Sequence, residues 1–520
     1  MKHIKYQKAV SGMIVINETE SARQIKAGAI LGYLTIGVNL LAGLIYTPWI
    51  IRNLGQDNYG LYTLSVSIIS ILVMDFGLGA AVTRFLSLYN SKNDQEAINN
   101  LLGIIYKLFI FLDFIILLVL AVAYFNIGSI YKELSPAEIE KLKVIFIISS
   151  CYSLLSFPFG TLNGILTSYE KFIPLKISEL LAKILNMGLI FGALQMGYGL
   201  NVLVIVNAVT GGISILLKLV FVKKYTFIKV NFRYKAKKIT REIFQFSIWT
   251  TVISIAQRFI YNIIPSILGI YSGAVSISVF GASATIEGMV YTFATAINGL
   301  FLPKVSRILN EKNREDNLLN LMVKVGRIQL ILIGMIFTGF LAVGRDFIGF
   351  WLGSGFRNAY ICILLLVLPS VIELPQHIAV LTVTASGMVK MQSIVYTIMA
   401  GINILFSMLL TREYQEIGAA VSVCIAYLFR TAAMNVVYHK KLNINIPVFF
   451  RECFGRLCLP LGISLAAAVF IAFLPGGKIM LFLAKGAAMV VIYLGVFWIC
   501  GLNTFEKGLF LSVCKRGIGK

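Results

Sequence analysis

Residues 101–126, LLGIIYKLFIFLDFIILLVLAVAYFN, decide the fold class of this chain. The stretch contains two charged residues, Lys107 and Asp113, and is otherwise almost wholly apolar. A helix needs about 20 apolar residues to cross the hydrocarbon of a bilayer, and it satisfies its own backbone hydrogen bonds there. The sequence therefore predicts a transmembrane helix.

The composition of the whole chain agrees with this stretch. Of the 520 residues 58% are hydrophobic and 13% are charged, and the mean hydropathy is +0.85. A soluble globular protein of this size does not have such a balance. Residues 1–26 are polar and basic and lack the pattern of a cleaved signal peptide, so we expect the first span to be retained. The seven cysteines are scattered without a CxxC pair and predict neither a disulfide nor a zinc site.

Hydrophobic runs of sufficient length recur along the chain, and we interpret it as an all-α polytopic membrane protein with about 14 transmembrane helices. The predicted spans are 27–51, 60–84, 101–126, 143–165, 175–199, 201–222, 243–270, 276–300, 322–344, 359–386, 390–410, 416–438, 456–475 and 478–500.

The basic residues predict the orientation of the spans. If both termini are cytoplasmic, the inside segments carry far more Lys and Arg than the alternate outside loops. Residues 223–241 are the most basic of these segments, and they predict a cytoplasmic tether near anionic headgroups or, alternatively, a substrate-binding loop. The formal charge of +23 is thus spread between spans, which argues against a nucleic-acid binder and indicates topology signals of an inner-membrane protein with both termini cytoplasmic.

The basic loop divides the first twelve spans into two sets of six. Span one begins near Ala27 and span seven near Ile243, an offset of about 216 that indicates a parallel repeat around a central cavity. The predicted divisions are a cytoplasmic segment 1–26, an N-lobe 27–222, the loop 223–242, a C-lobe 243–440, and a segment 441–520 that holds the last two spans and a cytoplasmic C-terminus.

Short motifs in both halves resemble one family of transporters. They are RNLGQDNYGLY at 52–62, DFGLG at 75–79, TRF at 83–85, FLPKVSR at 301–307 and IGAA at 417–420. In this order they resemble the bacterial polysaccharide flippases, the Wzx-type O-antigen and capsule transporters of the MATE-like exporter superfamily. The resemblance covers most of residues 25–440.

This resemblance implies two six-helix lobes in a V-shaped arrangement, with two further C-terminal helices packed outside. It implies alternating access and, as cargo, an oligosaccharide linked to undecaprenyl diphosphate. The related lipid II flippases have arginines in the first two spans. Span one has no charge between Ala27 and Ile51, which argues against a lipid II role here.

Cationic residues within or beside spans are the candidates for binding an anionic cargo, because an intramembrane charge must meet a partner or water. Arg258, midway along span seven, is the leading candidate; the structural alternative is an ion pair with Glu287. Further substrate-binding candidates are Arg84 and Arg307, which otherwise anchor to headgroups, and Lys183, which otherwise pairs with Glu179 four residues earlier.

Acidic groups and a histidine inside spans are candidates for coupling transport to H+ or Na+. Glu373 and His377 are four residues apart beside Pro369 and Pro375, where the helix is expected to kink. Glu287 and Asp75 are the other candidates, and buried structural hydrogen bonding is the alternative for this group.

The sequence carries no motif for enzymatic chemistry: GxxxxGK[ST], HExxH and GxSxG are absent, and nothing indicates a cofactor or a metal. We therefore expect a transporter driven by an ion gradient, a substrate gradient or a separate protein. Its expected partners are the lipid-linked oligosaccharide, membrane lipids and a polysaccharide polymerase or ligase. The alternatives are a cation-coupled drug antiporter with an acidic cavity, a lipid II flippase, or a membrane polymerase or ligase, for which the longest outside loop, 126–142, is short.

Overall fold

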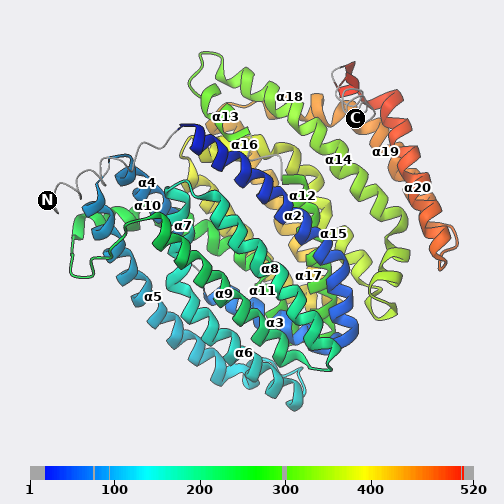
Figure 1. Ribbon diagram of the computed structural model, residues 1–520. Coiled ribbons are helices and arrows are strands. Elements are labelled where there is room, and N and C mark those ends of the chain that lie inside the picture. Colours follow the sequence, from blue (N-terminus) through cyan, green and yellow to red (C-terminus); the bar gives the residue numbers. More distant parts are fainter. Residues whose placement is uncertain (1–17, 74–75, 93, 296–300, 505, 509–520) are drawn as a thin grey trace. The chain divides into compact units, whose positions relative to one another are not determined.

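The computed structural model describes residues 18–73, 76–92, 94–295, 301–504 and 506–508. Over these residues the protein is built of helices and has no β-strand (Figure 1). The all-α fold class that the sequence predicts is confirmed. The chain divides into two compact units, and each is described by itself.

Unit 1 contains residues 1–46 and 53–258. Its helices are α2 (Glu18–Leu54, of which 47–52 belong to unit 2), α3 (Gln56–Leu72), α4 (Leu78–Ser91), α5 (Gln95–Ile130), α6 (Pro136–Ser156), the short η1 (Phe157–Gly160), α7 (Thr161–Ser168), α8 (Phe172–Gln195), α9 (Leu200–Tyr225) and most of α10 (Lys237–Tyr261). Within unit 1, α8 packs along α9, α4 along α7, and α3 along α6.

Unit 2 contains residues 47–52 and 259–520. Its helices are α11 (Ile263–Tyr271), α12 (Gly273–Thr295), α13 (Leu302–Ile308), α14 (Arg314–Trp351), η3 (Ser354–Phe356), α15 (Ala359–Glu373), η4 (Leu374–Gln376), α16 (His377–Ala385), α17 (Val389–Leu442), α18 (Ile446–Cys453), η5 (Gly455–Leu457), α19 (Cys458–Phe473), α20 (Ile479–Val496) and η6 (Phe497–Gly501). The spans that include α12 and α15 are the most enclosed, each with 61% of its apolar window buried, so they form the interior of this unit.

Twelve helices of the described residues are long and apolar enough to cross a membrane. The count differs from the expected fourteen at two places. The predicted span 60–84 is divided, because α3 ends at Leu72 and α4 begins at Leu78, with Phe76 and Gly77 in left-handed backbone conformations. The predicted spans 390–410 and 416–438 fall within the single element α17.

The two halves of α17 meet at a sharp turn. Gln415 has φ 48° and ψ −129°, which no helix accommodates. A Cβ on Gly418 would lie 2.2 Å from the Leu410 carbonyl oxygen, so the turn requires glycine at this position. The IGAA motif at 417–420 thus places its glycine where the chain reverses.

The basic segment 223–241 is docked on α5. The Asn231 amide donates to the Asn99 carbonyl at 3.1 Å, and the Asn231 side chain donates to the Asn100 Oδ1 at 2.7 Å. A Cβ on Gly103 would lie 1.9 Å from the Asn231 carbonyl oxygen, so glycine permits the close approach. The Lys107 ammonium donates to the Tyr234 carbonyl at 2.8 Å. The segment is therefore held against α5 by specific contacts.

The C-terminal hairpin of α19 and α20 packs along α14 (orange to red in Figure 1). Arg327 donates to both Glu506 carboxylate oxygens, from Nε at 2.6 Å and from Nη2 at 2.9 Å. Further along α14, Asp346 pairs with Lys485 at 2.8 Å, and between the two pairs the Tyr493 hydroxyl donates to the Ile331 carbonyl at 2.7 Å. The hairpin is thus an integral part of unit 2.

Candidate functional site

Unit 2 encloses an ion pair between Arg430 on α17 and Glu373 at the end of α15. The two side chains are 5% and 10% exposed. A buried charge is tolerated when a partner and further polar groups surround it. The pair is therefore the centre of a polar core inside an otherwise apolar helical unit.

Aromatic faces complete the surroundings of the arginine. The Arg430 guanidinium carbon lies 4.2 Å from the ring centroid of Tyr427 and 5.2 Å from that of Tyr396. A guanidinium is attracted to the negative face of an aromatic ring, and more strongly where water is excluded. The rings thus lie over the guanidinium, and its N–H groups remain available to carboxylates such as that of Glu373.

A second carboxylate, that of Glu287 on α12, interacts electrostatically with the same arginine. Glu287 is 6% exposed and is hydrogen-bonded to the Tyr261 phenol. The rings of Tyr261 and Tyr427 lie 5.8 Å apart, which links the tyrosine at the end of α10 to the core. The core thus brings two acidic groups to one arginine.

The span that supplies Tyr261 is broken directly after it, where α10 ends and α11 begins at Ile263. The Asn403 side-chain amide donates to the carbonyls of Phe259, at 3.3 Å, and Ile260, at 3.0 Å. Carbonyls in the last turn of a helix lack an intrahelical donor, and Asn403 supplies one. The helix end is therefore stabilised next to the polar core.

A second break lies beside Glu373, where η4 separates α15 from α16 and contains Pro375. A Cβ on Gly326 would lie 2.6 Å from the Pro375 carbonyl oxygen, so α14 approaches the break closely. His377 opens α16, and its buried Nδ1 has no hydrogen-bond partner among the described residues. The kink that the sequence predicts beside Pro369 and Pro375 is present, and Glu373 and His377 flank it.

Arg258 lies in unit 1, where its guanidinium donates a hydrogen bond to the Ser70 carbonyl of α3. Ser70 is in the last turn of α3, so the arginine supplies a donor to an end carbonyl and faces the negative end of the helix dipole. The predicted pair of Arg258 with Glu287 stays a prediction, because the two residues belong to different units.

The other two arginine candidates, Arg84 and Arg307, lie on different helices, α4 and α13. Arg84 is exposed on α4, with its guanidinium 5.9 Å from the Phe85 ring centroid, and Arg307 is exposed in the last turn of α13. Asp75, the predicted ion site of the N-lobe, lies outside the described residues.

The predicted pair of Lys183 with Glu179 is wrong. The Glu179 carboxylate instead meets Lys176 at 2.9 Å on its own helix and Lys218 of α9 at 3.8 Å. The half-buried Lys183 makes no ion pair within the part of the chain that the structure describes. The neighbouring helix α9, which sequence spacing does not reveal, supplies the competing cation.

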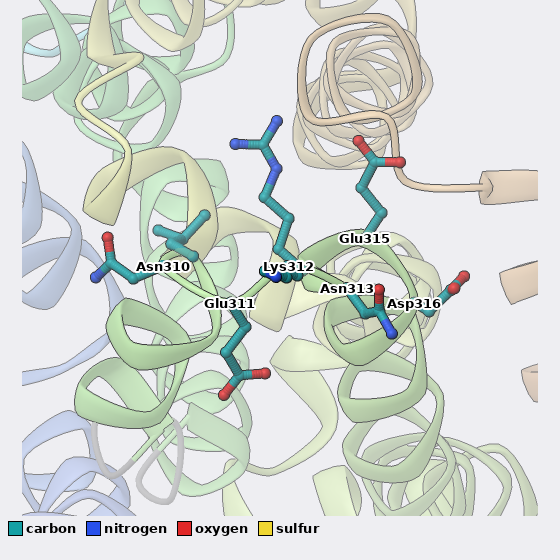
Figure 2. A pocket seen from close by; sticks show the side chains of 8 residues that line it. Asn310, Glu311, Lys312, Asn313, Glu315 and Asp316 are labelled. Carbon is teal, nitrogen blue, oxygen red and sulfur yellow. The ribbon is translucent and has the colours of Figure 1, made fainter.

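An open hollow lies on the loop between α13 and α14 (Figure 2). It is lined by one continuous run of residues, 309–316, which includes Glu311, Lys312, Arg314, Glu315 and Asp316. All of these residues except Leu309 and Glu315 are exposed. The Glu315 carboxylate accepts a hydrogen bond from the Asn443 side-chain amide at 3.0 Å. The hollow is a surface turn apart from the polar core. Among the described residues, no group of three or more His, Cys, Asp or Glu is placed to hold a metal ion.

The tyrosines and Asn403 are the members of the polar core that sequence reasoning missed. Tyr261, Tyr396 and Tyr427 lie in spans where an aromatic residue usually packs against lipid or helices. Arg430 lies in the predicted span 416–438, and a charge inside a span predicts a partner. The sequence did not identify Glu373 as that partner, since the two residues are 57 positions apart.

Comparisons with known proteins agree on one class. The family described as "Polysaccharide biosynthesis protein" matches residues 25–309. The "Putative O-antigen transporter" of Escherichia coli K12 is 22% identical over 404 residues, which are 76% of this chain and 92% of the relative.

Solved structures show the same fold. The lipid II flippase MurJ in an inward closed conformation aligns with a TM-score of 0.71 and 15% identity, over 93% of this chain and 99% of that one. An inward-facing multidrug resistance MATE family transporter of the MOP superfamily aligns with a TM-score of 0.62 and 13% identity, over 78% of this chain and 96% of that one. The fold is therefore that of the MATE-like exporters.

Proposed function

Because the chain belongs to the polysaccharide biosynthesis protein family, we propose that it is a flippase for an oligosaccharide linked to undecaprenyl diphosphate. The cargo passes from the cytoplasmic to the outer leaflet of the inner membrane by alternating access. The observation that carries the proposal is the match to this family on a chain with the fold of membrane flippases and transporters. The O-antigen transporter named above supports the same class of cargo.

Arg258 is the residue we assign to the diphosphate. Its guanidinium is half-buried and is bonded to a carbonyl oxygen, which is a neutral acceptor. An arginine forms stronger, bidentate bonds with phosphate oxygens, so an arriving diphosphate can replace the Ser70 carbonyl as its partner. Arg84 and Arg307, both exposed, are candidates for the first contact with the anionic head of the cargo.

The polar core of unit 2 is the proposed coupling site. Glu287 and Glu373 share Arg430, and His377 flanks the same helix break as Glu373. Binding of H+ or Na+ to the acidic group that the arginine leaves uncompensated changes the charge beside both breaks. This arrangement supplies a link between an ion gradient and helix bending.

The same core favours one other function, a cation-coupled antiporter of small molecules, because it holds two carboxylates to one arginine. A lipid II role is not favoured, since residues 30–51 of the first span carry no charged residue and its arginine, Arg52, lies in the last turn of the helix. Direct assay of the cargo separates these functions.

The test is a flipping assay in proteoliposomes. An undecaprenyl-diphosphate oligosaccharide with a fluorescent label on the sugar is incorporated, and a membrane-impermeant quencher reports the fraction in the outer leaflet. In vesicles that contain the full chain, we expect cargo from the inner leaflet to reach the outer leaflet, so that the quencher removes nearly all of the fluorescence. Retention of the inner-leaflet signal, together with efflux of a cationic dye, would replace the proposal with the antiporter.

Arg258→Ala tests the assignment of the anion site. We expect it to abolish flipping in the same assay, and surface polysaccharide in cells, at an unchanged protein level. The matched control is Arg241→Ala, since Arg241 is exposed on the same helix. Normal export by Arg258→Ala would remove Arg258 from the site.

A further inference from the structure

A stripe of polar residues follows the seam between α8 and α9 in unit 1, which lie side by side (Figure 1). On α8 the polar positions recur at helical spacing, and those on α9 do the same, so each set occupies one face of its helix. The seam is formed by Lys176, Glu179, Lys183 and Asn186 on α8 and by Asn207, Thr210, Ser214 and Lys218 on α9.

The first part of the seam, next to the start of α8, is a partly open ionic cluster. Glu179 meets Lys176 at 2.9 Å and Lys218 at 3.8 Å. The Lys176 and Glu179 side chains are 34% and 31% exposed, and that of Lys218 is 12% exposed. One carboxylate is thus shared by two ammonium groups, and the cluster has an excess of positive charge.

Lys183 adds a further cation deeper in the seam. It lies eleven residues after Phe172, the start of α8, which corresponds to about 16 Å along the helix axis. Lys183 is thus about two helical turns beyond Lys176 and lies within the predicted span 175–199. A half-buried cation there, without an ion pair among the described residues, calls for an anionic ligand or water.

Beyond Lys183 the seam continues as a network of neutral polar groups. The Asn186 side-chain amide donates to Asn207 Oδ1 at 2.6 Å and to Thr210 Oγ1 at 3.0 Å. The Asn207 amide donates to the Tyr62 hydroxyl of α3 at 3.1 Å. Amides and hydroxyls of this kind match the hydrogen-bonding groups of a sugar.

We propose that the seam of α8 and α9 binds the diphosphate of the lipid-linked cargo, with Lys183 and Lys218 as its cationic contacts. The inference rests on the proposed function and adds a second anion-binding position in unit 1 besides Arg258. Each phosphate of a sugar-capped diphosphate carries one negative charge, which matches the excess of Lys176, Lys183 and Lys218 over Glu179. The Asn186 network lies on the deeper side, where the first sugar would follow the phosphates.

The spacing of the cations favours a diphosphate over the single phosphate of a membrane lipid. Lys183 lies one turn beyond Glu179, about 6 Å along the axis, and Lys218 lies opposite Glu179. Two phosphates in a row can therefore contact one cation each. A phospholipid headgroup presents one phosphate and would leave one of these cations without a partner.

Binding to the purified full chain tests this inference. The protein is placed in nanodiscs of zwitterionic lipid and titrated with fluorescent undecaprenyl diphosphate, with undecaprenyl monophosphate and phosphatidylglycerol as competitors. We expect the diphosphate to bind more tightly than either competitor. Lys183→Met should weaken diphosphate binding about tenfold, which is the loss of one charge-assisted contact, and should reduce the preference over the monophosphate. Lys183→Arg should retain both.

The matched control is Lys132→Met, an exposed lysine between α5 and α6 and outside the seam. Unchanged diphosphate affinity in Lys183→Met would overturn the inference, and so would an equal loss of phosphatidylglycerol binding, which would identify an ordinary lipid site. A wild-type chain that binds the diphosphate but does not flip the cargo would instead contradict the proposed function and leave the seam as a binding site.

Discussion

Arg430 is the residue of the polar core that joins its acidic groups to its aromatic rings. It forms an ion pair with Glu373, interacts with Glu287, and lies over the rings of Tyr427 and Tyr396. A buried ion pair adds little net stability, because the desolvation of both charges offsets their attraction, whereas removal of one partner is strongly destabilising. Net stability therefore does not account for the pair, and we propose that it has a role in the transport cycle.

Arg430→Met tests this at the level of one residue. The substitution leaves Glu373 and Glu287 buried without their cation, which should cost about 3 to 5 kcal/mol of stability. We expect a lower melting temperature of the purified protein, measured by the fluorescence of a thiol- or core-reporting dye, and loss of flipping. Arg451→Met, on the exposed side of α18, should change neither.

The double variant Arg430→Met with Glu373→Leu separates stability from function. It removes both charges of the pair, so part of the lost stability should return. Flipping should remain absent, because the charged core is gone. Recovery of transport together with the melting temperature would show that the pair is only structural.

At the level of elements, α14 is joined to the C-terminal hairpin by two buried ion pairs. Arg327 and Asp346 are 19 residues apart on α14, or about 28 Å, close to the thickness of the hydrocarbon. Lys485 also donates to the Leu474 carbonyl at 2.9 Å, and a Cβ on Gly476 would lie 2.0 Å from Asp346 Oδ1. The hairpin is therefore fixed to α14 near both ends of the span.

Lys485→Met should loosen this attachment. It leaves the Asp346 carboxylate buried without a cation, and we expect a fall in melting temperature and faster labelling of a cysteine introduced at the buried Met489 of α20. The reversed pair, Asp346→Lys with Lys485→Asp, should restore part of the protection. Lys478→Met, exposed just before α20, is the control. Equal labelling of all variants would mean that apolar packing alone holds the hairpin.

The sequence predicts these elements better than it predicts their contacts. A run of about 20 apolar residues is sufficient to identify a span, so α5, α8 and α9 lie where expected. The break between α10 and α11 was not predictable, because the apolar pattern continues across it and the stabilising amide of Asn403 is 143 residues away from Ile260.

The candidate site was predictable to a similar extent. Charges inside spans are rare, so Glu373 and Arg430 could be recognised from the sequence. Their partners depend on which helices are neighbours. Glu179 illustrates this, because the predicted i, i+4 contact with Lys183 is replaced by contacts with Lys176 and with Lys218 on the next helix.

At the scale of the whole molecule, α10 belongs to both units and carries functional candidates of each. Arg258 contacts the end of α3 in unit 1, and Tyr261, three residues later, contacts Glu287 in unit 2. The helix ends at Tyr261, where Asn403 binds its last carbonyls. We therefore propose that a change of charge at Glu287 alters the end of α10, three residues along the same helix from Arg258.

This arrangement predicts that flipping depends on an ion gradient and that Glu287 mediates the dependence. In proteoliposomes, a gradient of H+ or Na+ directed toward the cytoplasmic side should raise the initial rate of cargo flipping, and an ionophore specific for the coupling ion should remove the increase. Glu287→Gln keeps a hydrogen-bonding group for Tyr261 but cannot take up the ion, so it should keep the slow basal rate and lose the response.

Glu311→Gln, on the exposed loop before α14, should respond as the wild type does. A gradient response that persists in Glu287→Gln would place the coupling outside this core, and a wild-type rate that no ionophore changes would mean that the cargo gradient alone drives transport.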